Sequence, residues 1–162
     1  MTKLQPGDAA PDIALPLDDG RNFALGAQRG RPVVLFFYPA DDTAGCTSEN
    51  REFSDLAPQF AALGASLVGI SPDSLAKHEK FRRKHGLEVP LAADPDRLAI
   101  NAYDLWQPKK LYGRDFMGLI RTSFIIAADG TIAAIIPATR IAGHAQKVLE
   151  ALRDHLGKTA PK

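Results

Sequence analysis

Residues 33–49 read VVLFFYPADDTAGCTSE and join an apolar run to the start of an amphipathic segment. The run from Val33 to Tyr38 is β-branched, aliphatic or aromatic, which predicts a short buried strand that ends before Pro39. From Phe53 onward apolar residues recur at helical spacing, which predicts a helix that begins close to Cys46. The stretch therefore predicts a strand, a loop and a helix in succession, with the only cysteine of the chain in the first turn of the helix.

The position of Cys46 favours a reactive thiol. Backbone N–H groups at a helix N-terminus have no partner inside the helix, and together with the positive end of the helix dipole they favour thiolate over thiol. Thr43 precedes the cysteine by three residues and can direct its hydroxyl at the sulphur. Pro39 fixes the backbone where the strand ends. Pro39, Thr43 and Cys46 are therefore candidate catalytic residues.

The spacing Pro-x-x-x-Thr-x-x-Cys, formed by these three residues, resembles the peroxidatic loop of the peroxiredoxins. The longer string Tyr-Pro-x-Asp-x-Thr-x-Gly-Cys-Thr-x-Glu is similar to the PrxQ or bacterioferritin comigratory protein (BCP) branch, within the AhpC/TSA family. Further matching blocks follow in the family's order: PGDAAP at 6–11, GLIRTSF at 118–124 and GHAQKVL at 143–149. The resemblance extends over most of the chain.

The resemblance implies a thiol-dependent peroxidase that reduces hydrogen peroxide and small organic hydroperoxides through a sulfenic acid on Cys46. It places Arg121 at the arginine of the family's Arg-x-x-Phe block, where the guanidinium would stabilise the thiolate and polarise the peroxide. Glu49, one turn into the helix, would orient Arg121 through a bidentate contact. Thr43 and backbone N–H groups would hold the peroxide oxygens. The implied chemistry requires no metal and no organic cofactor.

The chain departs from the resembled branch at Arg51. Many PrxQ proteins carry a resolving cysteine five residues after the peroxidatic one, and here that position holds arginine. Because Cys46 is the only cysteine, no internal disulfide can form, and the sulfenic acid must be recycled from outside. The expected partners are a peroxide and an external thiol: thioredoxin, glutaredoxin, glutathione or Cys46 of a second subunit. A monomer or weak homodimer is the expected state.

Composition limits the class of protein. With 162 residues, of which 45% are hydrophobic, the chain is expected to form one domain over residues 1–157, with a disordered tail at 158–162. Because 20 Lys and Arg face 19 Asp and Glu, charge gives no reason to expect nucleic acid or a membrane as partner. The chain shows no apolar signal region, and a lone cysteine fits a reducing compartment, so a cytoplasmic protein is expected.

The other segments predict an α/β class. A short hairpin is expected near the N-terminus, a strand after the cysteine helix, a second hairpin around Asp129-Gly130, and a closing helix that ends at Gly157. Further helices are expected at 75–85 and 97–103. This order is that of a thioredoxin-like fold: a central mixed β-sheet flanked by helices, with an N-terminal β-hairpin.

Two places in the sequence conflict with a regular element. Pro58 lies inside the predicted cysteine helix and is expected to kink or break it. Residues 105–118 show no clear periodicity, which predicts a long surface loop. The aromatic residues of this loop, Trp106 among them, would line a peroxide pocket, contact another subunit or pack in the core.

Two other classes of function remain open. A thioredoxin-like binding module or holdase would use Cys46 only as a small buried residue, since free cysteines are usually inert core groups. A Cys–His hydrolase would pair Cys46 with a histidine. No histidine has a spacing that points to the cysteine or forms a metal motif, and surface or capping roles are expected for His78, His85, His144 and His155.

Overall fold

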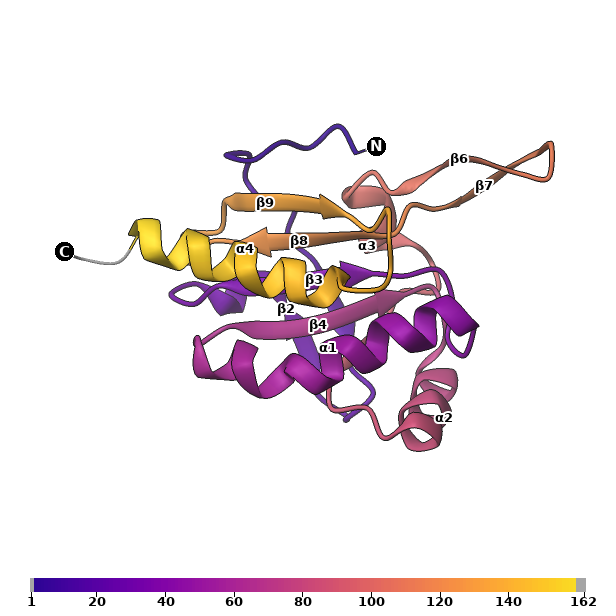
Figure 1. Cartoon of the computed structure of the whole chain (residues 1–162), viewed down its shortest axis with the longest axis horizontal. Coiled ribbons are helices and arrows are strands. Elements are labelled where there is room, and N and C mark those ends of the chain that lie inside the picture. The colour runs from indigo at the N-terminus through magenta and orange to yellow at the C-terminus, as the bar shows by residue number, and fades with distance from the viewer. Residues whose placement is uncertain (1, 160–162) are drawn as a thin grey trace.

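A computed structural model describes residues 2–159 of the chain. Its central sheet is formed by β3 (Val33–Phe37), β4 (Ser66–Ser71), β5 (Leu91–Ala93), β8 (Thr122–Ile126) and β9 (Ile132–Pro137). The strand order is β5-β4-β3-β8-β9, and Figure 1 shows β4, β3, β8 and β9 in this succession. β3, β4 and β5 are parallel, whereas β8 is antiparallel to both β3 and β9. The predicted mixed sheet is confirmed.

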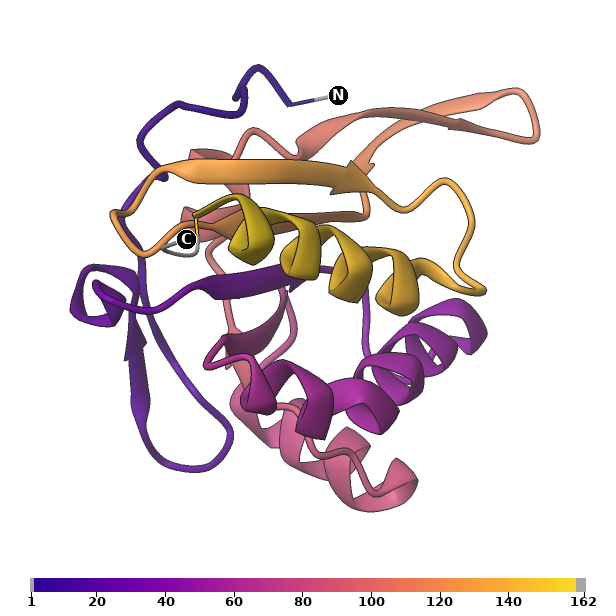
Figure 2. The same cartoon turned by 60° about the vertical axis from the view of Figure 1, so that its left-hand side comes forward.

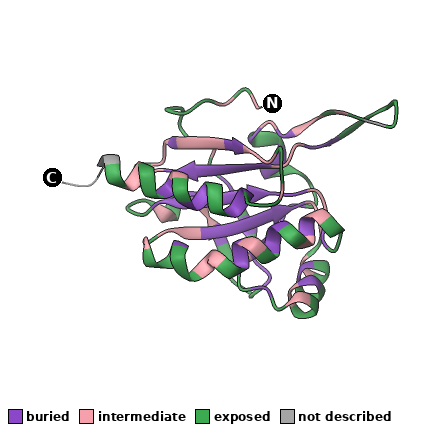
Figure 3. Ribbon diagram, viewed as in Figure 1, coloured by how far each residue is buried: buried purple, intermediate pink, exposed green. Residues whose placement is uncertain are grey.

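Different elements cover the two faces of this sheet, because side chains alternate along each strand. Val34 and Phe36 of β3 pack against α1 (Ala44–Ala62) and α4 (His144–Thr159), which lie beside each other on one face. Leu35 and Phe37 point to the other face, under the N-terminal hairpin and α3 (Leu98–Ala102). Figure 3 shows α1 and α4 buried on one side and exposed on the other, as amphipathic helices are.

The unit β3-α1-β4 forms as the sequence predicts. α1 begins directly after Thr43, and β4 pairs with β3 in parallel. Of the kink or break expected at Pro58, the break is wrong, because α1 runs through Pro58 to Ala62, and the kink stays a prediction. Pro58 is exposed, so its ring lies on the solvent side of the helix, away from the packed face.

α2 (Leu75–His85) has the bounds that the sequence predicts, and capping residues define both of its ends. The Ser74 side chain accepts a hydrogen bond from the Lys77 N–H, and Gly86 ends the helix with a left-handed φ of 61°. α3 begins one residue later than expected, since Arg97 is its N-cap with a φ of 57°. The Asp94 carboxylate accepts the N–H groups of Leu98 and Ile100, and so satisfies the first turn of α3.

The expected loop at 105–118 is wrong. This segment forms the antiparallel pair β6 (Trp106–Leu111) and β7 (Arg114–Leu119), joined through Tyr112 and Gly113. Figures 1 and 2 both show this hairpin extending away from the sheet. Its root lies next to the sheet, because β7 leads through Ile120 and Arg121 into β8.

The N-terminal segment forms a hairpin and the C-terminal segment forms a helix. β1 (Ala14–Pro16) and β2 (Asn22–Ala24) pair as the predicted N-terminal hairpin, and a 3-10 helix at Leu25–Gln28 leads into β3. α4 continues through the expected stop at Gly157 to Thr159. Residues 160–162 of the proposed tail lie outside the described residues. No helix between residues 2 and 159 combines the length and apolar character needed to cross a membrane.

Candidate active site

The loop between β3 and α1 positions the cysteine. Thr43 is the N-cap of α1, with extended backbone angles, and its Oγ1 accepts the Cys46 N–H at 3.3 Å. The same hydroxyl faces the Ala40 carbonyl at 3.4 Å. The Tyr38 N–H donates a hydrogen bond to the Ile70 carbonyl of β4, so pairing with β4 continues up to the residue before Pro39. Thr43 therefore caps the helix, rather than only facing the sulphur as the sequence suggested, and it fixes the first turn that carries Cys46.

Cys46 is buried, at 1% exposure, in the core cluster under α1 and α4. Burial alone would fit the structural role that a binding module requires. The neighbouring Gly45 shows how closely other groups approach: a Cβ there would lie 2.8 Å from Ile141 Cδ1 and 3.6 Å from Arg121 Nη2. The missing side chain at Gly45 thus makes room for Ile141, and the Arg121 guanidinium lies at ordinary contact distance from the first turn of α1.

Arg121 and Glu49 form a buried ion pair next to this turn. Arg121 Nη1 donates to Glu49 Oε1 at 2.7 Å, with the two side chains 16% and 1% exposed. The contact uses one carboxylate oxygen, so the expected bidentate geometry is wrong. Although burial opposes it, charge and hydrogen bonding from Glu49 and Cys46 raise the pKa of Arg121 above its ordinary value. The structure therefore brings Cys46, Thr43, Arg121 and Glu49 together, with Pro39 at the start of their loop.

The second Glu49 oxygen faces α4. Oε2 has no hydrogen-bond partner among the described residues and lies 3.9 Å from His144 Nε2. Burial raises the pKa of Glu49 to about 7, although the Arg121 guanidinium opposes the rise. His144 Nε2 is also 2.8 Å from Ser123 Oγ on β8. Burial, with Lys147 and Arg121 nearby, lowers the pKa of His144 to about 4, so this imidazole is neutral at physiological pH.

Sequence reasoning missed the place of His144. It does begin α4, as a helix-start role would require, but it is 3% exposed and lies behind the Arg121–Glu49 pair. His78 was also expected at the surface and is fully buried. Neither residue carries a local signal for burial, because the partners of both come from distant segments.

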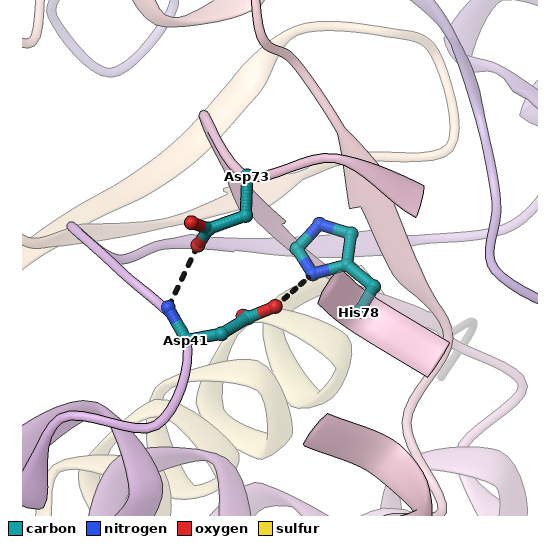
Figure 4. Close-up of side chains that lie close together, drawn as sticks. All are labelled: Asp41, Asp73 and His78. Carbon is teal, nitrogen blue, oxygen red and sulfur yellow. Dashed lines mark hydrogen bonds and ion pairs between the residues drawn. The ribbon is translucent and has the colours of Figure 1, made fainter. Parts of the chain in front are cut away.

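His78 anchors the loop that leads to Cys46. Its Nδ1 is 2.6 Å from Asp41 Oδ2 (Figure 4), and its Nε2 is 3.0 Å from the Ala92 carbonyl. A carbonyl only accepts, so Nε2 carries a proton, and one further proton lies between Nδ1 and Oδ2. The Tyr38 hydroxyl donates to the other Asp41 oxygen at 2.6 Å. Burial and the Asp41 charge raise the pKa of Tyr38, which keeps this hydroxyl a donor.

Asp41, Asp73 and His78 lie close enough to suggest a metal site, since their ligand atoms are within 4.8 Å of one another (Figure 4). Each of these atoms already has a hydrogen-bond or ion-pair partner. Asp73 Oδ2 accepts the Asp41 N–H at 2.7 Å, and its Oδ1 pairs with Lys77 at 2.9 Å. The cluster is therefore a hydrogen-bonded clamp between α2 and the loop that leads to Cys46.

Replacing His78 by alanine is expected to lower the free energy of unfolding by about 3–5 kcal/mol, because it leaves Oδ2 of the buried Asp41 carboxylate without its partner. Urea unfolding at neutral pH measures the change. His85→Ala is the matched control, since His85 lies on the same helix and pairs with the exposed Asp42 of the same loop at 2.9 Å. The control should change stability far less. Equal losses for the two variants would contradict the clamp.

Known proteins resemble this chain in both sequence and structure over most of its length. The AhpC/TSA family model matches residues 6–135. Peroxiredoxin Bcp of Bacillus subtilis is 37% identical over 93% of this chain and 96% of its own length. A solved structure of the bacterioferritin comigratory protein of Xanthomonas campestris, studied for alkyl peroxide reduction, superposes with a TM-score of 0.85 at 35% identity, covering 96% of this chain and 99% of that one. A PrxQ mutant of Xylella fastidiosa gives a TM-score of 0.88 at 31% identity, with coverage of 96% and 99%.

Proposed function

The chain belongs to the AhpC/TSA family and is a thiol-dependent peroxidase of the Bcp and PrxQ type with a thioredoxin-like fold, and we propose that Cys46 is its peroxidatic residue. The observation that carries the proposal is the placement of this thiol in the first turn of α1, beside the Arg121 guanidinium that Glu49 holds. A guanidinium and the helix N-terminus both stabilise a thiolate. An inert core cysteine needs neither.

The proposed reaction begins with the Cys46 thiolate. The sulphur attacks one peroxide oxygen, an S–O bond forms, the O–O bond breaks, and water or an alcohol leaves after taking up a proton. The sulphur loses two electrons and becomes a sulfenic acid, while the peroxide gains them. Arg121 and the N–H groups of the first turn of α1 stabilise charge on the leaving oxygen, and Thr43 keeps that turn in place. Pro39 positions the start of the loop.

The single cysteine determines how the enzyme is recycled. Arg51, at the resolving position of many PrxQ proteins, is exposed on α1. The sulfenic acid condenses with an external thiol to a mixed disulfide and water, and a second thiol then releases Cys46 and carries away the disulfide. Thioredoxin, glutaredoxin or glutathione supplies these thiols. The protein acts in the cytoplasm as a monomer or weak homodimer, without metal or organic cofactor.

Excess peroxide without thiol is expected to stop the enzyme after about one turnover, because the sulfenic acid has no internal thiol to protect it. The intact mass should rise first by one oxygen and later by two or three, with all oxidation on the Cys46 peptide. Dithiothreitol added early should restore activity, whereas late addition should not. Sustained turnover without added thiol would contradict external recycling.

The same oxidised protein identifies the reductant. Each candidate thiol is added to freshly oxidised enzyme, and intact mass with a non-reducing gel separates a glutathione adduct from a complex with a thioredoxin-family protein. A quantitative disulfide between two Cys46 residues would instead place resolution between subunits, and would contradict a first attack by thioredoxin, glutaredoxin or glutathione. Rapid recycling by one thiol, with the matching adduct, supports that thiol as the partner.

A further inference from the structure

Lys109 on β6 lies across the root of the hairpin. Its Nζ donates to the Leu119 carbonyl at 2.9 Å. Lys109 is paired with Phe116 of β7, so both side chains stand on the same face as Gly118. A Cβ at Gly118 would lie 2.8 Å from Lys109 Cδ and 3.2 Å from Phe116 Cε2. The missing side chain at Gly118 therefore leaves the path along which the lysine stem reaches its anchor.

The anchor lies close to Arg121 along the chain. Leu119 precedes Arg121 by two residues, and Lys109 interacts through charge with both Arg121 and Cys46. Burial and the Arg121 charge lower the pKa of Lys109, while Cys46 opposes this change. Lys109 is half-buried, so water and salt screen its charge less than they screen a surface lysine.

The charge of Lys109 is less compensated than that of Arg121. Arg121 forms its ion pair with Glu49 at 2.7 Å, so a large part of its field is offset by the carboxylate. Lys109 is anchored on a neutral carbonyl, and within residues 2–159 it forms no ion pair with a carboxylate. Its neighbour Lys110 points to the other face of the hairpin and pairs with Asp115 at 3.9 Å.

We propose that Lys109 is a positioning residue for the reaction proposed above, in which its ammonium group, held by the Leu119 carbonyl, stabilises negative charge on the Cys46 sulphur. The inference rests on the proposed function of Cys46. The groups that act on the thiol are then Glu49 from α1, Arg121 before β8, neutral His144 from α4 and Lys109 from β6. Among them Glu49 opposes the thiolate and offsets part of the positive charge of Arg121. Lys109 adds a positive charge that no ion-paired carboxylate among the described residues offsets.

The test measures alkylation of Cys46 by monobromobimane as a function of pH, in reduced protein and without peroxide. Cys46 is the only cysteine, so the label reports one site. In Lys109→Met the midpoint of the profile should rise by about 0.5–1 pH unit, as loss of one nearby, partly screened charge predicts. Lys110→Met, the matched control on the opposite face, should keep the wild-type midpoint. Lys109→Arg should restore it.

An unchanged midpoint in Lys109→Met would overturn the proposal. The same rise in Lys110→Met would also overturn it, because the effect would then belong to the hairpin as a whole. Faster labelling of Lys109→Met at every pH would indicate a loosened site and would equally contradict a charge effect. Since the assay uses no peroxide, a failure of the peroxidase proposal appears separately, in the turnover and mass measurements.

Discussion

Arg121→Ala is expected to slow the reaction of the reduced protein with hydrogen peroxide by about a hundredfold or more, because losing one charge-assisted donor at a site of developing charge costs this much. Arg121 is placed to act on both partners of the reaction. In the proposed reaction it stabilises the attacking thiolate, and it takes up charge on the leaving oxygen. Both contributions are lost together, and no other arginine between residues 2 and 159 is seen to share an ion pair with Glu49.

The measurement is the second-order rate constant by stopped flow under single-turnover conditions. Arg121→Ala leaves Glu49 buried without its partner, which threatens the fold. The double variant Glu49→Gln/Arg121→Ala removes that buried charge. It should be more stable than Arg121→Ala and should react with peroxide as slowly as Arg121→Ala. Arg51→Ala, an exposed arginine on α1, serves as control and should react at the wild-type rate. An unchanged rate in the double variant would mean that another cation serves the site.

The strand, loop and helix around Cys46 could be predicted from the sequence because their signals are local. The apolar run of β3 and the Ser74 and Gly86 limits of α2 each act within a few residues. These segments fold according to periodicity and capping. Pro58 is the exception, because this local signal predicted a break that α1 does not have.

The β6–β7 hairpin could not be predicted in this way. Much of it is exposed on both faces, so no alternation of apolar and polar residues marks the strands. Its turn places Tyr112 at a φ of 52° and Gly113 at 77°. Two positive φ values suit a tight hairpin turn, but tyrosine rarely adopts one, and Asn-Gly or Asp-Gly is the usual signal.

The candidate site was only partly accessible to sequence reasoning. Arg121 and Glu49 are 72 residues apart, and only the resemblance to a family linked them. His144 and Lys109 are linked to the site only by tertiary contacts. His144 lies beside Glu49 at the start of α4, and the Lys109 side chain passes over Gly118. The burial that gives Glu49 a pKa of about 7 likewise arises only when α1, α4 and the β7–β8 link pack together.

Cys46→Ser is expected to abolish peroxide reduction, with a loss of about a thousandfold or more, because serine at this position supplies no comparable nucleophile. The hydroxyl is close to the thiol in size, and the backbone N–H bond to Thr43 Oγ1 remains available. The fold should therefore persist, with an unchanged unfolding midpoint. Ser48→Ala, an exposed change in the same helical turn, is the matched control and should retain full activity.

The central claim, that Cys46 is the peroxidatic residue, is tested most directly by stopped-flow consumption of hydrogen peroxide in the presence of dithiothreitol. Wild type and Ser48→Ala should consume peroxide rapidly, whereas Cys46→Ser should not exceed the rate of dithiothreitol alone. Equal consumption by wild type and Cys46→Ser would contradict the account and leave Cys46 as a buried core residue of the thioredoxin-like fold.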